Sequence, residues 1–200
     1  IMKPGSQTMA VLLRYDEARA EQAVRSYTPQ RRLDLAAPAR RSSSELGVAL
    51  VGAGNLARWA HLPALRSIPH ARLVAVHSAA GPRGRTYGER FGAAYCTTDF
   101  DQILNDPAID AVLITSRNQH HASQAARSLR AGKHVFLAKP IAVDVPGCLA
   151  VEAAAARATQ AGRTFLVDYQ MPTDPLHQQI VRQVHEGAIG PVALVNSHYD

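Results

Sequence analysis

Short apolar runs alternate with longer mixed segments over most of the chain, from residue 47 onward. The runs are apolar on both faces, which is typical of parallel strands covered by helices on each side. They predict strands at residues 47–51, 72–76, 111–115, 134–137 and 164–169. The mixed segments predict helices at residues 55–67, 85–91, 121–131 and 146–161. Because strand and helix alternate, we expect an α/β fold with a doubly wound, Rossmann-like parallel sheet.

The start of the chain has a different composition. Residues 1–46 are predicted to be an N-terminal extension, with a strand at 9–15 and a helix at 16–26. The segment 31–44 is rich in Arg, Ala, Ser and Pro, which is typical of a linker. The Rossmann-like domain is then expected at residues 47–168.

The end of the chain is predicted to enter another unit. Residues 169–200 contain a predicted helix at 175–186 and a predicted strand at 192–198. A lone strand with an unpaired edge is normally a member of a sheet whose other strands lie elsewhere. We therefore expect this segment to be the beginning of a truncated second α/β domain.

Charge gives little support to a polyanionic partner. The chain has 22 Lys and Arg against 16 Asp and Glu, a formal net charge of +6. Half of this excess lies in residues 1–46 and half in the remainder, so it is not concentrated as a nucleic-acid surface requires. We expect no nucleic-acid partner; binding by the basic extension, the alternative, would weaken steeply with added salt. No apolar run approaches the roughly 18 residues that span a bilayer, so we expect no membrane partner either.

Cysteine and histidine positions argue against a metal site. Cys96 and Cys148 lie far apart and lack the spacing of metal ligands. They fit buried thiols in a reducing compartment better than a disulfide framework, which indicates a cytoplasmic protein. His120 and His121 are adjacent, and neighbouring side chains on an extended loop diverge too far to form a chelate alone. We expect no bound metal.

A glycine turn directly after the first predicted strand is the sharpest chemical signal. Gly52 permits a tight turn out of the strand, and Gly54 has no side chain to block a diphosphate from the backbone. Ala57 is small enough for the following helix to pack against the strand. Asn55 and Leu56 open that helix, whose free N–H groups and positive end favour phosphate charge. The pattern predicts a dinucleotide-binding site, although a packing turn or a methyltransferase would share part of it.

The end of the second predicted strand bears on which dinucleotide binds. Enzymes that use NAD place an Asp or Glu there for the adenine ribose, whereas this strand ends at His77 and Ser78. Arg83 and Arg85 follow in the adjoining segment, and a guanidinium can bind a 2′-phosphate in fork geometry. The pattern favours NADP, with NAD as the alternative; both arginines could instead be solvated.

Five motifs follow one another along the chain, each occurring once. They are the glycine turn with His-Leu-Pro-Ala-Leu at 61–65, Thr-Thr-Asp-Phe at 97–100, Leu-Asn-Asp-Pro-Ala-Ile-Asp at 104–110, Ala-Gly-Lys-His-Val-Phe-Leu-Ala-Lys-Pro at 131–140, and Glu-Gly-Ala-Ile-Gly at 186–190. In this order they make the chain similar to the Gfo/Idh/MocA oxidoreductases, the glucose–fructose oxidoreductase and inositol dehydrogenase group. The resemblance implies a dinucleotide-binding domain followed by a second α/β domain. In the family, that second domain supports the substrate and often a dimer contact.

The resemblance also implies roles for individual residues. Lys139 matches a lysine near the nicotinamide and the reacting hydroxyl, and Pro140 matches the proline that follows it. Ser116 and Asn118 match a loop that borders the nicotinamide ribose. An ammonium at Lys139 could hydrogen-bond the alkoxide that develops as hydride leaves. Ala138 stands where the family usually has Glu, so a positioning carboxylate is missing.

The function implied by the resemblance is hydride transfer between a nicotinamide and a secondary alcohol of a sugar, polyol or sugar derivative. The complete protein is then a homo-oligomer acting on a small sugar-like molecule. The family's proton-accepting histidine, in an Asp-x-x-x-His motif, would fall beyond residue 200, so we expect this chain alone to bind cofactor without meaningful catalysis. Ala138 and the missing pair favour the alternative, a non-catalytic nucleotide-binding or sensor module with a structural cofactor.

Overall fold

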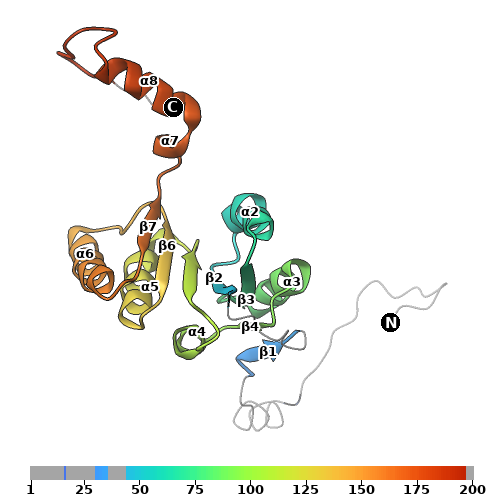
Figure 1. Ribbon diagram of the computed structural model, residues 1–200. Helices are drawn as coiled ribbons and strands as arrows, with labels where there is room; N and C mark the ends of the chain where they lie inside the picture. Colours follow the sequence, from blue (N-terminus) through green and yellow to red (C-terminus); the bar gives the residue numbers. More distant parts are fainter. Residues whose placement is uncertain (1–15, 17–29, 36–43, 197–200) are drawn as a thin grey trace. The chain divides into compact units, whose positions relative to one another are not determined.

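The computed structural model describes residue 16, residues 30–35 and residues 44–196 (Figure 1). The strands are β1 (Arg32–Asp34), β2 (Leu46–Val51), β3 (Ala71–His77), β4 (Tyr95–Thr97), β5 (Ala111–Ile114), β6 (His134–Ala138) and β7 (Phe165–Asp168). The helices are η1 (Ala57–His61), α2 (Leu62–Ser67), α3 (Gly81–Phe91), α4 (Phe100–Asn105), α5 (Asn118–Arg130), α6 (Val145–Gln160), α7 (Gln170–Thr173) and α8 (Pro175–His185).

The strands form one sheet in the order β1-β4-β3-β2-β5-β6-β7. All neighbours pair in parallel except β1, which is antiparallel to β4. From β2 the chain adds strands on one side as far as β4 and then returns to add β5, β6 and β7 on the other. The predicted doubly wound parallel sheet is therefore confirmed. The winding direction changes between β2 and β5, and ligands bind beyond the carboxyl ends of the strands at such a point.

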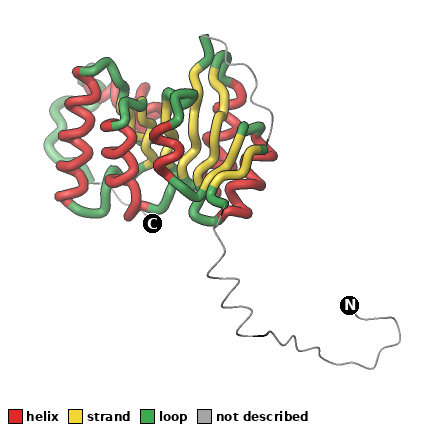
Figure 2. The backbone as a smooth tube through the Cα atoms, turned by 90° about the horizontal axis from the view of Figure 1, so that it is seen from below, coloured by secondary structure: helices red, strands yellow, loops and turns green. Residues whose placement is uncertain are grey.

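Helices cover both faces of the sheet (Figure 2), because successive residues of the central strands bury on opposite sides. In β2, Ala49 and Val51 pack in the core that also contains residues of α4, α5 and α6. Val48 and Leu50 of the same strand pack on the other face, with residues of η1, α2 and α3. This two-sided burial explains why the strands are apolar throughout rather than alternating.

The strand β4 and the helix α4 were not predicted from the sequence. The short strand β4 and the helix α4 lie between predicted elements, and at 3 and 6 residues they are too short to give a periodic signal. The predicted linker 31–44 is wrong in part, since β1 lies within it and pairs along β4. Backbone pairing to an existing sheet edge can order such a segment without a hydrophobic pattern of its own.

The C-terminal prediction holds for one element and fails for another. The predicted helix at 175–186 is α8, which Asp174 caps by accepting from the backbone N–H groups of Leu176 and His177. The predicted strand at 192–198 is absent over residues 192–196, where no neighbouring strand offers backbone partners among the described residues. The predicted strand 9–15 and all but residue 16 of the predicted helix 16–26 lie outside the described residues. Within the described part of the chain, no helix combines the length and apolar character that crossing a membrane requires.

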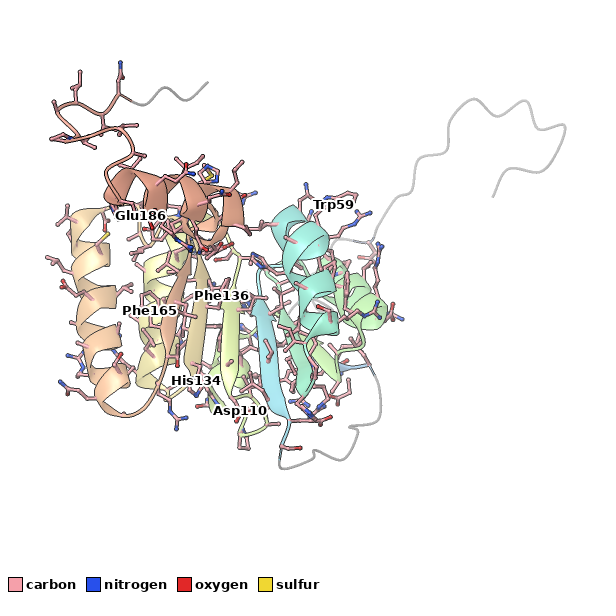
Figure 3. All side chains as sticks on the ribbon, turned by 45° about the horizontal axis from the view of Figure 1, so that its top comes forward. Trp59, Asp110, His134, Phe136, Phe165 and Glu186 are labelled. Atoms are coloured by element: carbon pink, nitrogen blue, oxygen red, sulfur yellow. The ribbon has the colours of Figure 1, made fainter. Side chains whose placement is uncertain are left out.

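Lys133 ties the amino end of β6 to its neighbours. Its side chain is only 8% exposed, and its Nζ donates to the backbone oxygens of Asp106 and Ile109, each at 2.8 Å. At the same edge, the backbone N–H of His134 donates to the oxygen of Asp110 at 2.9 Å. Figure 3 shows His134 and Asp110 close together there. The lysine of the Ala-Gly-Lys-His-Val motif therefore has a structural position, away from the carboxyl ends of the strands.

We expect Lys133→Met to lower the free energy of unfolding by about 2–4 kcal/mol, because the change leaves one buried and one partly buried carbonyl oxygen without their charged donor. Denaturant unfolding followed by circular dichroism measures the difference. Lys139→Met is the matched control at an exposed lysine and should change stability by less than about 0.5 kcal/mol. Equal stability of the two variants would contradict this role for Lys133.

Candidate functional site

A cavity of about 570 Å³ lies at the carboxyl ends of β2, β3 and β5, where the winding of the sheet reverses. It is lined by Gly52, Ala53, Gly54, His77, Ser78, Ala79, Ala80, Arg83, Thr115, Ser116, Arg117, Gln119, His120 and Gln124. A second hollow, of about 660 Å³, is formed by residues between Met171 and Glu186 only. The first cavity is the candidate site, because it combines the glycine turn with the switch point of the sheet.

The turn at Gly52 requires glycine for two reasons. Its φ is +100°, a conformation that other residues rarely adopt, and a Cβ there would lie 2.5 Å from the Cα of Ser116. Both backbone groups of Gly52, the N–H and the carbonyl, also make hydrogen bonds. Its N–H donates to the oxygen of His77 at 3.0 Å, and its carbonyl accepts from the Thr115 hydroxyl at 2.7 Å. One residue therefore joins the ends of β2, β3 and β5.

Gly54 differs from Gly52, because the space where a side chain would begin is open, although its carbonyl accepts from the Tyr87 hydroxyl at 3.1 Å. A Cβ on Gly54 would meet only the oxygen of Thr115, at 3.8 Å, so the position is open toward the cavity. The helix begins at Asn55 without a side-chain cap, and its first N–H groups have no preceding turn to bond. Ala57, fully buried, packs the helix against the sheet. This open backbone and uncapped helix start fit a diphosphate.

The charged side chains that line the cavity are all basic. Arg83, Arg117, His77 and His120 line it, and no Asp or Glu is among its lining residues. Burial lowers the pKa of the His77 imidazole below its ordinary value, while the nearby Asp99 carboxylate acts in the opposite direction. The His77 ring also contacts the ring of Phe100, with centroids 5.4 Å apart. A pocket of this charge suits an anionic ligand.

The structure separates the two arginines that the sequence grouped together. Ser78 is buried beside the end of β3 and lines the cavity together with Arg83. Arg85 does not line it; its Nε donates to Glu89 along α3 at 2.7 Å, and this bond raises the pKa of the Arg85 guanidinium. Asn55 and Leu56 are exposed at the start of the helix and do not line the cavity.

The loops after β5 and β6 carry the remaining predicted residues. The Ser116 hydroxyl donates to the side-chain oxygen of Gln124 at 2.6 Å and lines the cavity, whereas Asn118, the first residue of α5, is exposed outside it. Lys139 is exposed after β6 and joined to Pro140 by a cis peptide bond; neither lines the cavity. Ala138 is buried at the end of β6.

Sequence reasoning missed several polar residues that build this end of the sheet. Thr115 and Gln124 hold the glycine turn and the β5 loop, and the only sequence signal was a pair of hydroxyl residues after an apolar strand. The π-helical segment η1 presents His61 to Asp168 at the end of β7, with 3.2 Å between Nε2 and Oδ2. Among the described residues, no group of three or more His, Cys, Asp or Glu is arranged to hold a metal.

The sequence profile of a known family matches this part of the chain. The family is described as an oxidoreductase family with an NAD-binding Rossmann fold, and its profile matches residues 46–169. Inositol 2-dehydrogenase of Acidothermus cellulolyticus is 33% identical over 151 residues, which cover 74% of this chain and 43% of that protein. A dTDP-3,4-didehydro-2,6-dideoxy-α-D-glucose 3-reductase of Actinomadura kijaniata is 29% identical, over 76% of this chain and 44% of the relative. The chain thus spans less than half the length of these relatives.

Solved structures show the same architecture. The apo scyllo-inositol dehydrogenase of Lactobacillus casei is similar with a TM-score of 0.68 at 28% identity, over 75% of this chain and 44% of that one. A 3-ketoreductase from Actinomadura kijaniata, in complex with NADP and TDP-benzene, is similar with a TM-score of 0.65 at 29% identity, over 73% and 44%. The fold, the glycine turn and the profile match agree, and the chain belongs to the Gfo/Idh/MocA family of oxidoreductases.

Proposed function

We propose that the chain is the nucleotide-binding part of an NAD(P)-dependent oxidoreductase that acts on a secondary alcohol of a sugar, polyol or sugar derivative. The observation that carries this proposal is the open glycine turn at the switch point of the sheet. The relatives' names support the substrate class, since they include an inositol dehydrogenase, a sugar 3-reductase and a 1,5-anhydro-D-fructose reductase. Because the chain covers less than half of each relative, the activity belongs to the complete protein.

The glycine turn would bind the diphosphate of the cofactor. Gly52 shapes the turn, Gly54 leaves room, and the backbone N–H groups of Asn55 and Leu56 are the donors at the start of the helix, since the N–H of Gly54 already donates to the oxygen of Gly52. Ser116 and Asn118 would border the nicotinamide ribose. In this arrangement the chain's role at the diphosphate is carried by backbone atoms, so side chains at Asn55 and Leu56 can remain exposed without weakening it.

The same cavity favours NADP over NAD. Ser78 occupies the end of β3, where a carboxylate would repel a 2′-phosphate, and Arg83 lines the cavity beside it. Arg85 is the second candidate at this position, although its guanidinium pairs with Glu89. Because Asp and Glu are absent from the lining residues, every charged neighbour of a bound 2′-phosphate there would be basic.

Lys139 is proposed to hold the reacting oxygen, next to Pro140 on the loop after β6. When bound, the nicotinamide supplies the carbon that accepts or donates hydride. The Lys139 ammonium, exposed at the carboxyl edge of the sheet, would donate a hydrogen bond to the substrate oxygen and stabilise its developing negative charge. Proton acceptance is assigned to the remainder of the complete protein, so the 200-residue chain is expected to bind cofactor without turnover.

A second candidate is a nucleotide-binding or sensor module without catalysis. Ala138 favours it, because this buried methyl group stands where the family usually has the Glu that would position Lys139. If the full-length protein bound the nucleotide but no sugar of a test panel reduced that nucleotide, the result would favour the sensor.

We further propose that residues 47–168 are the nucleotide-binding domain, that residues 1–46 are an extension and that residues 169–200 begin the substrate domain. We propose that the complete protein is a cytoplasmic homo-oligomer without nucleic-acid or membrane partners.

The direct test of the proposal is a titration of the chain with NADPH, followed by the change in nicotinamide fluorescence. We expect saturable binding at one site. Absence of binding to both NADPH and NADH, by a chain whose circular dichroism shows it to be folded, would refute the proposed function.

Gly54→Ala should weaken NADPH binding by about tenfold or more, because it puts a methyl group where the diphosphate approaches the backbone. Stability should hardly change, since the new Cβ has only one ordinary contact, at 3.8 Å. Fluorescence titration and thermal unfolding measure the two effects. Gly81→Ala, with a similar single contact at 3.8 Å, is the matched control and should retain affinity. Equal affinity of Gly54→Ala and the unaltered chain would contradict the diphosphate assignment.

Arg83→Ala should weaken NADPH binding by about tenfold and NADH binding little, because a charged hydrogen bond to the 2′-phosphate is lost. Arg85→Ala, in which the helical Arg85–Glu89 pair is removed, should cost far less affinity. Parallel titrations with both nucleotides measure the ratio. The preference for NADP would be disproved by an equal loss for NADH and NADPH, or by NADH binding more tightly to the unaltered chain.

A further inference from the structure

His121 is a buried histidine with a carbonyl oxygen at each ring nitrogen. It is the fourth residue of α5 and only 1% exposed. Its Nδ1 lies 2.6 Å from the backbone oxygen of Pro140, and its Nε2 lies 3.0 Å from the backbone oxygen of Ser116. Both acceptors are backbone atoms of loops at the carboxyl edge of the sheet. The nucleotide assignments above use neither nitrogen.

The two loops have no direct strand pairing between them. The parallel ladder of β5 and β6 ends at the pair Ile114 and Leu137. Beyond that pair the chain continues into the Ser116 loop on one side and into Lys139 and Pro140 on the other. The imidazole spans the two segments just after the ladder stops. It thereby takes the place that a further pair of backbone hydrogen bonds would have in a longer sheet.

The contact continues toward the glycine turn. Thr115, next to Ser116, donates its hydroxyl to the oxygen of Gly52 at 2.7 Å. A connected path therefore runs from the turn after β2, through the loop after β5, to the Lys139 loop after β6. His121 lies in the helix α5 and is buried, so its position in this path is fixed by regular secondary structure.

An imidazole suits this position better than other side chains of its size. Its two nitrogens lie on opposite sides of a rigid ring, so one group reaches two separate carbonyls. An imidazolium donates through both nitrogens and so bonds both carbonyls at once, whereas a neutral imidazole donates to one carbonyl and turns a lone pair toward the other. A phenyl ring would fill the same space and leave both partly buried oxygens without a donor, which is costly.

We propose that His121 is a positioning residue, which fixes the Lys139–Pro140 loop against the Ser116 loop and so aligns Lys139 with the nicotinamide half of the cofactor site. The part concerning the cofactor rests on the proposed function. The mechanical part does not, because it concerns only the two loops. The histidine is not among the lining residues of the cavity, and both of its hydrogen-bond partners are backbone oxygens, so it acts through the backbone.

The experiment compares His121→Phe with His134→Phe. His134 begins β6 at the opposite edge of the sheet, where its Nδ1 accepts from the backbone N–H of Thr164 at 3.0 Å. Hydrogen–deuterium exchange read by mass spectrometry follows peptides that cover residues 114–119 and 138–143. Both peptides should exchange about tenfold faster in His121→Phe and remain unchanged in His134→Phe. Unchanged exchange of the two loops in a folded His121→Phe variant would overturn the proposal.

A second measurement separates positioning from general loosening. We expect His121→Phe to weaken the binding of NADPH by about tenfold. The affinity for adenosine 2′,5′-bisphosphate, which lacks the nicotinamide half, should not change. Equal losses for both ligands would overturn the positioning role. If the unaltered chain binds neither ligand, the proposed function fails, and the exchange experiment still decides whether His121 holds the loops.

A conservative variant keeps the test decisive if His121→Phe does not fold. His121→Gln retains one donor group, so it should reach one of the two carbonyls and restore protection to one loop only. Its NADPH affinity should fall between those of the unaltered chain and His121→Phe. Faster exchange spread over the whole sheet, rather than confined to residues 114–119 and 138–143, would show a merely structural histidine.

Discussion

The backbone bend at Gly52 is the constraint on which the rest of this structure depends. Its φ of +100° and the 2.5 Å that would separate a Cβ from Ser116 leave room for no side chain. Bonds to His77 and Thr115 then join the ends of three parallel strands at one residue. Because the winding of the sheet reverses there, the helix that follows starts at the edge of a cavity rather than against another strand.

Two kinds of group complete the carboxyl edge of the sheet. Backbone atoms and basic side chains line the cavity, and the absence of an acidic residue from the lining suits an anionic ligand. Buried polar side chains support this edge: Thr115, itself a lining residue, bonds the turn, and His121 contacts the two loops that follow β5 and β6. His121 does not line the cavity, so it can be altered separately from the residues that do.

The sequence was sufficient to predict the elements that have a periodic or local sequence pattern. Strands buried on both faces have a continuous apolar signal, and the glycine turn has a fixed pattern, so the sheet and the turn were found. The edge strand β1 was taken for a linker, because its order comes from pairing with β4 rather than from its own residues. The carbonyl partners of His121 and Lys133 were likewise out of reach, since only the folded chain brings these groups together.

The central claim, that the turn after β2 cradles a nicotinamide dinucleotide, is tested most directly by backbone amide NMR of the chain during titration with NADP. We expect the largest shifts on Gly52, Gly54, Asn55 and Leu56, with smaller shifts at Ser78 and Ser116. Shifts confined to the hollow of α7 and α8, with the glycine turn unaffected by saturating nucleotide, would contradict it.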